Sequence, residues 1–69
     1  MSIFGDRLKE LRANKNVTQK QMAETLGITE QAYQKYEYAM REPNHETTVK
    51  LAMYFSVSTD YLLGLSDNL

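Results

Sequence analysis

The side chains that most often perform catalysis or hold metal ions are scarce in this sequence. It contains no Cys and a single His, His45. No pair of carboxylates stands outside the spacing of an ordinary helix face. Catalysis needs a nucleophile, a base or a metal set converging on one place, and metal sites need several such ligands. We therefore expect no enzyme activity, no metal site and no cofactor.

The sequence supports hydrogen bonding to a ligand better than it supports catalysis or metal binding. The residues concerned are polar and stand at helical spacing in the middle of the chain. With 3.6 residues per turn, Tyr33, Tyr36 and Glu37 fall on one face of a helix there. A different face mixes donors, acceptors and a positive charge, and it carries Glu30, Gln31, Gln34, Lys35 and Tyr38. Such a face is also typical of any solvated helix, so the residue types alone do not establish that it binds a ligand.

Charge is unevenly distributed along the chain. The formal net charge of −1 disfavours indiscriminate binding to nucleic acid, which needs a strongly basic surface. Residues 1–41 contain seven Lys or Arg and five Asp or Glu, a balance of +2. Residues 42–69 contain one Lys and four acidic residues, a balance of −3. Any basic face therefore belongs to the first part of the chain.

Length and composition limit the architecture. The 69 residues suffice for one domain, which buries only about 60% of the surface that its unfolded chain exposes. Without Cys, stability must come from helix packing or dimerisation. No apolar run approaches the roughly 20 residues that span a bilayer. Charges interrupt the N-terminal stretch MSIFGDRLKELR where a signal peptide is apolar. We expect a cytoplasmic protein without a membrane segment.

Apolar spacing and capping residues predict five helices and no strand. The first helix is expected over residues 2–14, and the third is expected to end near residue 38. Gly27 is expected to turn the chain between the second and third helices with a left-handed backbone. The last four helices are expected to begin at Thr18, Thr29, Pro43–Asn44 and Ser58. These signals predict an all-α domain over residues 1–64, followed by a C-terminal tail over residues 65–69.

The segment QKQMAETLGITEQAYQKYEY, residues 19–38, resembles the helix-turn-helix unit of Cro, the phage repressors and the xenobiotic-response-element regulators. The resemblance lies in spacing, with the small residue Ala23 where two helices cross and Gly27 at the turn. It continues through RLKELR, REP and VSTDYLLG, so it covers nearly the whole chain. It implies a compact five-helix domain of the lambda-repressor type that binds DNA and regulates transcription.

The resemblance further implies that the third helix lies in the major groove of double-stranded DNA. Gln31 is suited to a paired hydrogen bond with adenine, Lys35 to guanine acceptors and Glu30 to the cytosine amino group. Glu30 has an alternative role, because a carboxylate in the first turn also suits the helix dipole. The residues expected to contact bases are Glu30, Gln31, Gln34, Lys35 and Tyr38.

Other positions match the phosphate contacts of the family. Thr18 and Gln19 stand at the start of the second helix, where free amides and the dipole attract anions. Capping alone is an alternative role for Thr18. Lys20 and Arg41 add positive charge for further phosphates, although single basic residues are also common on soluble surfaces. We expect these residues to position the domain on the DNA backbone.

Two further features concern the scaffold of the third helix. Arg12 and Glu37 match a pair that bridges the first and third helices in the family, a plain surface pair being the alternative. Tyr33 replaces a branched aliphatic residue, so its ring is expected in the core, with its hydroxyl finding water or a partner at the rim. The family usually has Asn-Gly where this chain has Tyr38 and Ala39, so a backbone contact to phosphate through that Gly is not carried over.

We therefore expect a sequence-specific repressor that binds a DNA operator as a homodimer. Leu65 and Leu69, four residues apart beyond the last helix, are the expected interface residues. The alternative is an antitoxin or a protein-interaction module with the same fold, whose partner protein the sequence does not identify. The chain could also be the amino-terminal part of a longer regulator.

Overall fold

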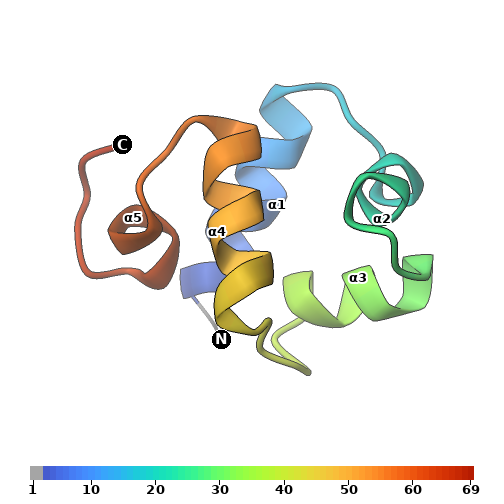
Figure 1. Ribbon diagram of the computed structural model, residues 1–69. Coiled ribbons are helices and arrows are strands. Elements are labelled where there is room, and N and C mark those ends of the chain that lie inside the picture. The colour runs from blue at the N-terminus through green and yellow to red at the C-terminus, as the bar shows by residue number, and fades with distance from the viewer. Residues whose placement is uncertain (1–2) are drawn as a thin grey trace.

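A computed structural model describes residues 3–69, which form five helices and no strand. In Figure 1, α1 and α4 occupy the centre, α2 and α3 lie on one side, and α5 lies on the other. The predicted all-α fold is confirmed, and the expected start of the first helix at residue 2 lies outside the described residues. The helices are α1 (Ile3–Asn14), α2 (Gln19–Leu26), α3 (Glu30–Glu37), α4 (His45–Phe55) and α5 (Thr59–Leu63).

A polar side chain caps the first turn of each of the last four helices. Thr18, Thr29, Asn44 and Ser58 have extended backbone, and the side-chain oxygen of each accepts from the amide three residues ahead. These bonds satisfy amides that have no partner within the helix. Thr18 also donates its own amide to Gln21 Oε1 at 2.8 Å, which completes a capping box. The boundaries predicted from capping residues are confirmed.

All five helices contribute to one core, which includes the ring of Tyr33. This side chain is fully buried and packs edge to face on Tyr36, with 6.4 Å between the ring centroids. The expectation that the Tyr33 ring fills the core is confirmed. The other buried apolar residues are Leu8 of α1, Met22 and Ala23 of α2, Leu51 and Ala52 of α4, and Leu62 of α5.

Helix α1 approaches the end of α3 so closely that only glycine fits at residue 5. A Cβ atom on Gly5 would lie 2.5 Å from the backbone oxygen of Glu37 and 3.1 Å from that of Tyr36. Both neighbours are backbone atoms, which cannot move aside as a side chain can. Gly5 therefore determines how near α1 lies to α3, the helix that carries the polar face.

Left-handed backbone occurs at the end of α2 and after α3. Gly27 has φ 70°, which confirms the left-handed backbone predicted for this turn. Ala39 has φ 60°, a conformation that costs a residue with a side chain about 1–2 kcal/mol. Ala39 therefore holds a strained backbone just after α3.

Ala39→Gly is expected to raise the free energy of unfolding by up to about 1 kcal/mol, because it removes this strain. The gain is smaller than the strain because glycine also makes the unfolded chain more flexible. Urea denaturation followed by circular dichroism measures the change. Ala13→Gly in α1 is the control and should lower stability, since that residue is helical. A lowered unfolding midpoint for Ala39→Gly would contradict the account.

The segment after α5 folds back on the domain. The Arg7 guanidinium donates to the backbone oxygen of Tyr61 and, at 2.7 Å, to that of Ser66. It also forms an ion pair with Asp67 at 2.8 Å. Residues 65–69 contain no helix, and these bonds connect them to α1 and α5. Within residues 3–69 none of the helices has the length and apolar composition to cross a membrane.

Candidate nucleic-acid interface

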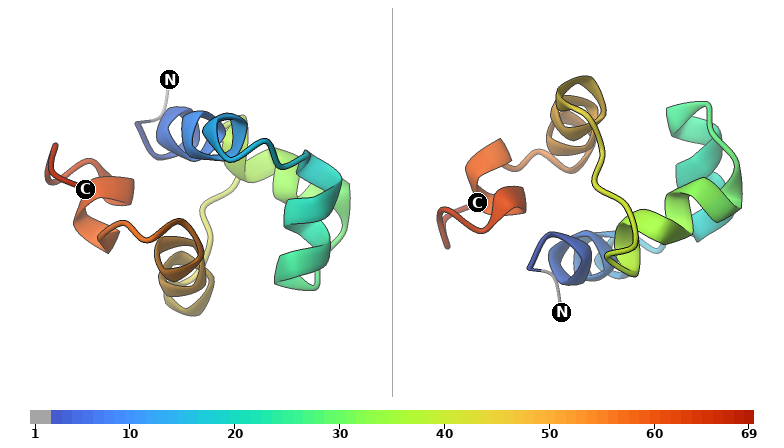
Figure 2. Two further views of the ribbon diagram at one scale, coloured as in Figure 1. Left: turned by 90° about the horizontal axis from the view of Figure 1, so that it is seen from above. Right: turned by 90° about the horizontal axis from the view of Figure 1, so that it is seen from below.

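Helices α2 and α3 form a tight corner at one side of the molecule. Three residues separate them, and the helices pack directly on each other. Ala23, the small residue of α2, is buried at 2% exposure. Seen from above and below in Figure 2, the pair lies apart from α5, which is at the opposite side of α1 and α4. The corner therefore presents α3 at the edge of the domain.

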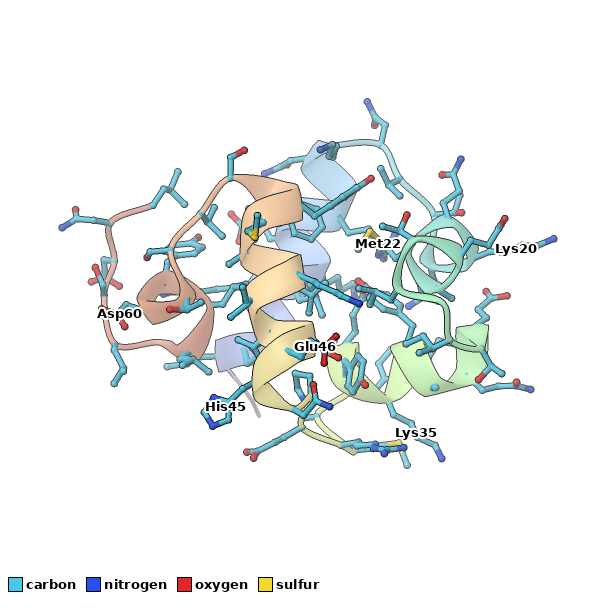
Figure 3. All side chains as sticks on the ribbon, in the orientation of Figure 1. Lys20, Met22, Lys35, His45, Glu46 and Asp60 are labelled. Atoms are coloured by element: carbon cyan, nitrogen blue, oxygen red, sulfur yellow. The ribbon has the colours of Figure 1, made fainter. Side chains whose placement is uncertain are left out.

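The outer face of α3 is polar and open to solvent. Glu30, Gln31 and Lys35 are exposed. Tyr38, just past the end of the helix, has 58% of its surface exposed. Figure 3 shows Lys35 extending from α3 away from α4. These side chains lie where a ligand could reach them. Gln34, the other expected base contact, is half-buried and donates one hydrogen bond from its NH2 group to Gln19.

The residues expected to contact phosphate lie beside this face. Thr18 and Lys20 are exposed at the start of α2, and Figure 3 shows Lys20 extending outward from the domain. Arg41 is exposed in the loop that follows α3. Gln19 is half-buried and bonds to Gln34 of α3 at 3.1 Å. The start of α2 and the polar face of α3 therefore adjoin.

Arg12 and Glu37 form an ion pair between α1 and α3. Arg12 Nε donates to Glu37 Oε2 at 2.6 Å, and Arg12 Nη2 donates to Glu37 Oε1 at 3.3 Å. The Glu37 side chain has no exposed surface, so a plain surface pair is excluded. Arg12 Nη1 also donates to the backbone oxygen of Val17 at 3.0 Å, just before α2. Through these bonds Arg12 connects α1 to α3 and to the segment that leads into α2.

Two further donors surround the Glu37 carboxylate. The Tyr33 hydroxyl donates to Glu37 Oε2 at 2.6 Å, and Gln19 Nε2 donates to Glu37 Oε1 at 3.1 Å. The Tyr33 hydroxyl was expected to find water or a partner at the rim of the core. It has a partner, Glu37, but the expected position at the rim is wrong because the bond is buried. The hydroxyl lies inside because Tyr33 and Glu37, four residues apart on α3, share its inward face. That spacing was the available sequence signal for the contact.

The hydrogen bonds keep Glu37 ionised. Burial would raise the pKa of its carboxyl, but the bonds from Arg12, Tyr33 and Gln19 outweigh burial and hold the pKa below the ordinary 4.5. The hydrogen bond with Glu37 raises the pKa of Arg12. Burial, together with the bond to Glu37, raises the pKa of Tyr33 far above the ordinary 10.0. At neutral pH the site therefore holds a carboxylate, a guanidinium and a neutral phenol.

These pKa shifts predict a loss of stability at both ends of the pH range. The lowered pKa of Glu37 adds stability that is complete above pH 4.5 and is lost as pH falls through the folded pKa. The raised pKa of Tyr33 adds stability that is complete below pH 10.0 and is lost above it. Urea titrations should show a shallower acid decline in Glu37→Gln and a shallower alkaline decline in Tyr33→Phe. Parallel pH profiles for wild type and variants would contradict the shifts.

A corner of two short helices, the second braced from within by a buried ion pair, defines a helix-turn-helix domain. Among the known families, the family model described as Helix-turn-helix matches residues 8–62. The chain belongs to the helix-turn-helix family.

Regulators of this family in Bacillus subtilis are similar in sequence. The chain is 49% identical over 61 residues to the SPbeta prophage-derived uncharacterized HTH-type transcriptional regulator YonR, covering 88% of this chain and 56% of YonR. It is 47% identical over 61 residues to the HTH-type transcriptional regulator ImmR, covering 88% of this chain and 48% of ImmR. The chain thus spans about half the length of the curated relatives that it matches.

A solved repressor structure has the same fold. It is the P22 c2 repressor protein in complex with synthetic operator 9T in the presence of Tl+. The TM-score is 0.85 at 26% sequence identity, and the match covers 96% of this chain and 100% of that chain. The agreement extends over all five helices of this domain.

Proposed function

We propose that this chain binds double-stranded operator DNA in a sequence-specific manner and represses transcription, with α3 in the major groove. The observation that carries the proposal is the exposed polar face of α3, held outward by the buried Arg12–Glu37 pair. The same fold belongs to the P22 c2 repressor in its complex with operator DNA, which supports this ligand. Because the proposed ligand is DNA, we propose that the protein acts in the cytoplasm.

The exposed residues of the interface divide into two roles. Glu30, Gln31, Lys35 and Tyr38 are proposed to contact base edges, since they lie on or just beyond the outer face of α3. Thr18, Lys20 and Arg41 are proposed to contact phosphates. Base contacts distinguish sequences, whereas phosphate contacts set position and add affinity to any DNA.

The distribution of charge supports specific rather than general binding. Lys20, Lys35 and Arg41 are exposed on or beside the α2–α3 corner. Figure 3 shows the acidic residue Asp60 at the opposite side of the domain from Lys20. A net charge of −1 leaves little attraction to DNA that does not engage the corner. We therefore propose that affinity for random DNA is weak.

We further propose that the chain binds as a homodimer. One small module gives limited affinity, whereas two copies present two α3 helices to half-sites about one helical turn, roughly 34 Å, apart. Leu65 and Leu69 support this proposal, because 76% and 69% of their surfaces are exposed to solvent. Covering large apolar side chains of this kind would stabilise a pair of domains.

Selection of bound sequences from random duplex DNA tests the proposed function. The wild-type chain is expected to enrich a pseudo-palindrome, and a footprint on that sequence should cover both half-sites. Enrichment of a single isolated half-site would contradict the dimer. Failure to enrich any sequence would contradict operator binding itself.

A further inference from the structure

A line of hydrogen bonds connects the buried carboxylate of Glu37 to the outer face of α3. Gln19 Nε2 donates to Glu37 Oε1 at 3.1 Å, and Gln34 Nε2 donates to Gln19 Oε1 at 3.1 Å. Glu37 has no exposed side-chain surface, whereas Gln19 and Gln34 are half-buried. The line therefore begins in the core and ends at the surface where DNA is proposed to bind.

The chemistry of the three groups sets the direction of these bonds. An ionised carboxylate only accepts hydrogen bonds, so Gln19 must turn its NH2 group toward Glu37. The Gln19 oxygen then faces Gln34, which must donate to it from its own NH2 group. Rotating the Gln19 amide by half a turn would place its oxygen against the carboxylate, and rotating the Gln34 amide would place its oxygen against that of Gln19. The line uses one N–H of Gln34 and leaves its carbonyl oxygen and its second N–H outside it.

We propose that Glu37, acting through Gln19, fixes the amide of Gln34 so that its oxygen faces DNA and selects a base with an exocyclic amino group. In the major groove adenine N6 and cytosine N4 are donors, whereas guanine and thymine present acceptors. This inference rests on the proposed function, because it assumes that α3 lies in the major groove. Gln19 is a positioning residue here, since it affects the choice of a base through Gln34.

Nuclear magnetic resonance of the free protein tests the line of bonds without DNA. The side-chain NH2 protons of Gln19 and Gln34 should be shifted and protected from exchange relative to those of exposed Gln31. Gln19→Leu keeps Arg12 and Tyr33 on the carboxylate, so the domain should remain folded. It should return the Gln34 NH2 signals to the values of a free amide. Free-amide signals for Gln34 in the wild type would overturn the proposal.

Modified duplexes test the base selection. The base pair concerned is the one whose preference changes in Gln34→Ala during selection from random DNA. At that base pair, adenine is replaced by unsubstituted purine, which lacks the amino group, or cytosine is replaced by an analogue without its amino group. Wild-type affinity should fall about tenfold, while Gln34→Ala should be insensitive to the missing group. Gln19→Leu should lose most of the wild-type sensitivity, and the same modification elsewhere in the duplex serves as the control.

The outcomes separate this inference from the proposed function. A wild-type chain that ignores the missing amino group, or a Gln19→Leu variant with full sensitivity, overturns the base selection while operator binding stands. A chain that shows the protected NH2 signals but prefers no DNA sequence overturns the proposed function, and the base selection with it.

Discussion

Glu37→Ala is expected to lower the free energy of unfolding by about 3 kcal/mol, because it removes the shared acceptor of a buried cluster. Arg12 would keep a charge that is 16% exposed without its carboxylate partner. The hydroxyl of Tyr33, inside the core, would lose its acceptor. A domain of this size has only about 5 kcal/mol or somewhat more in total. The variant should therefore unfold at much lower urea concentration, which chemical denaturation measures.

Glu46→Ala is the matched control for this experiment. It also removes one carboxylate from an ion pair, because Lys50 lies 3.6 Å from Glu46 one turn along α4. Both of these side chains are largely exposed, so the loss should stay below about 0.5 kcal/mol. Equal losses for the two variants would show that burial of the Glu37 cluster does not contribute to stability.

Gly5→Ala is expected to cost about 1–2 kcal/mol, although alanine normally favours a helix. The added methyl would meet the backbone oxygen of Glu37 at 2.5 Å, so α1 and α3 must separate. Overpacking of this kind costs about 1–3 kcal/mol and occasionally more, and the helix propensity of alanine returns up to about 1 kcal/mol. Thermal denaturation measures the change. Glu10→Ala, at an exposed position of α1, should leave the melting temperature nearly unchanged.

An unchanged melting temperature for Gly5→Ala would contradict the close approach of α1 to α3. Because α3 carries the proposed base contacts, the same substitution should also weaken operator binding. We expect that weakening even at temperatures where the variant is fully folded.

Local features of the fold were predictable from the sequence. A capping side chain and the amide that it satisfies lie three residues apart, so Thr18, Thr29 and Ser58 could be identified by type and position alone. Gly27 was predictable for the same reason, since the left-handed turn involves only its own backbone. The exposure of Gln31 and Lys35 follows from helical periodicity, whereas their contacts with DNA remain predictions.

Features that depend on how helices pack were not predictable in the same way. The contact of Gly5 with α3 joins residues more than thirty positions apart, and its geometry arises only when the helices pack. The bonds from Gln19 to Glu37 and Gln34 likewise join separate helices. For Arg12 and Glu37 the resemblance to the family supplied the pairing, but the burial of the carboxylate arises only when the helices pack.

Whether α3 distinguishes base sequences is tested by comparing Gln31→Ala with Arg41→Ala on the selected operator and on a scrambled duplex at several salt concentrations. Gln31→Ala is expected to bind the operator about tenfold more weakly, with little change on scrambled DNA, because it loses a base contact. Arg41→Ala is expected to weaken binding to both duplexes by similar factors and to reduce the salt dependence by about one unit, because a phosphate contact releases counterions. If Gln31→Ala keeps the full preference of the wild type for the operator, α3 does not distinguish bases through this residue and the account is contradicted.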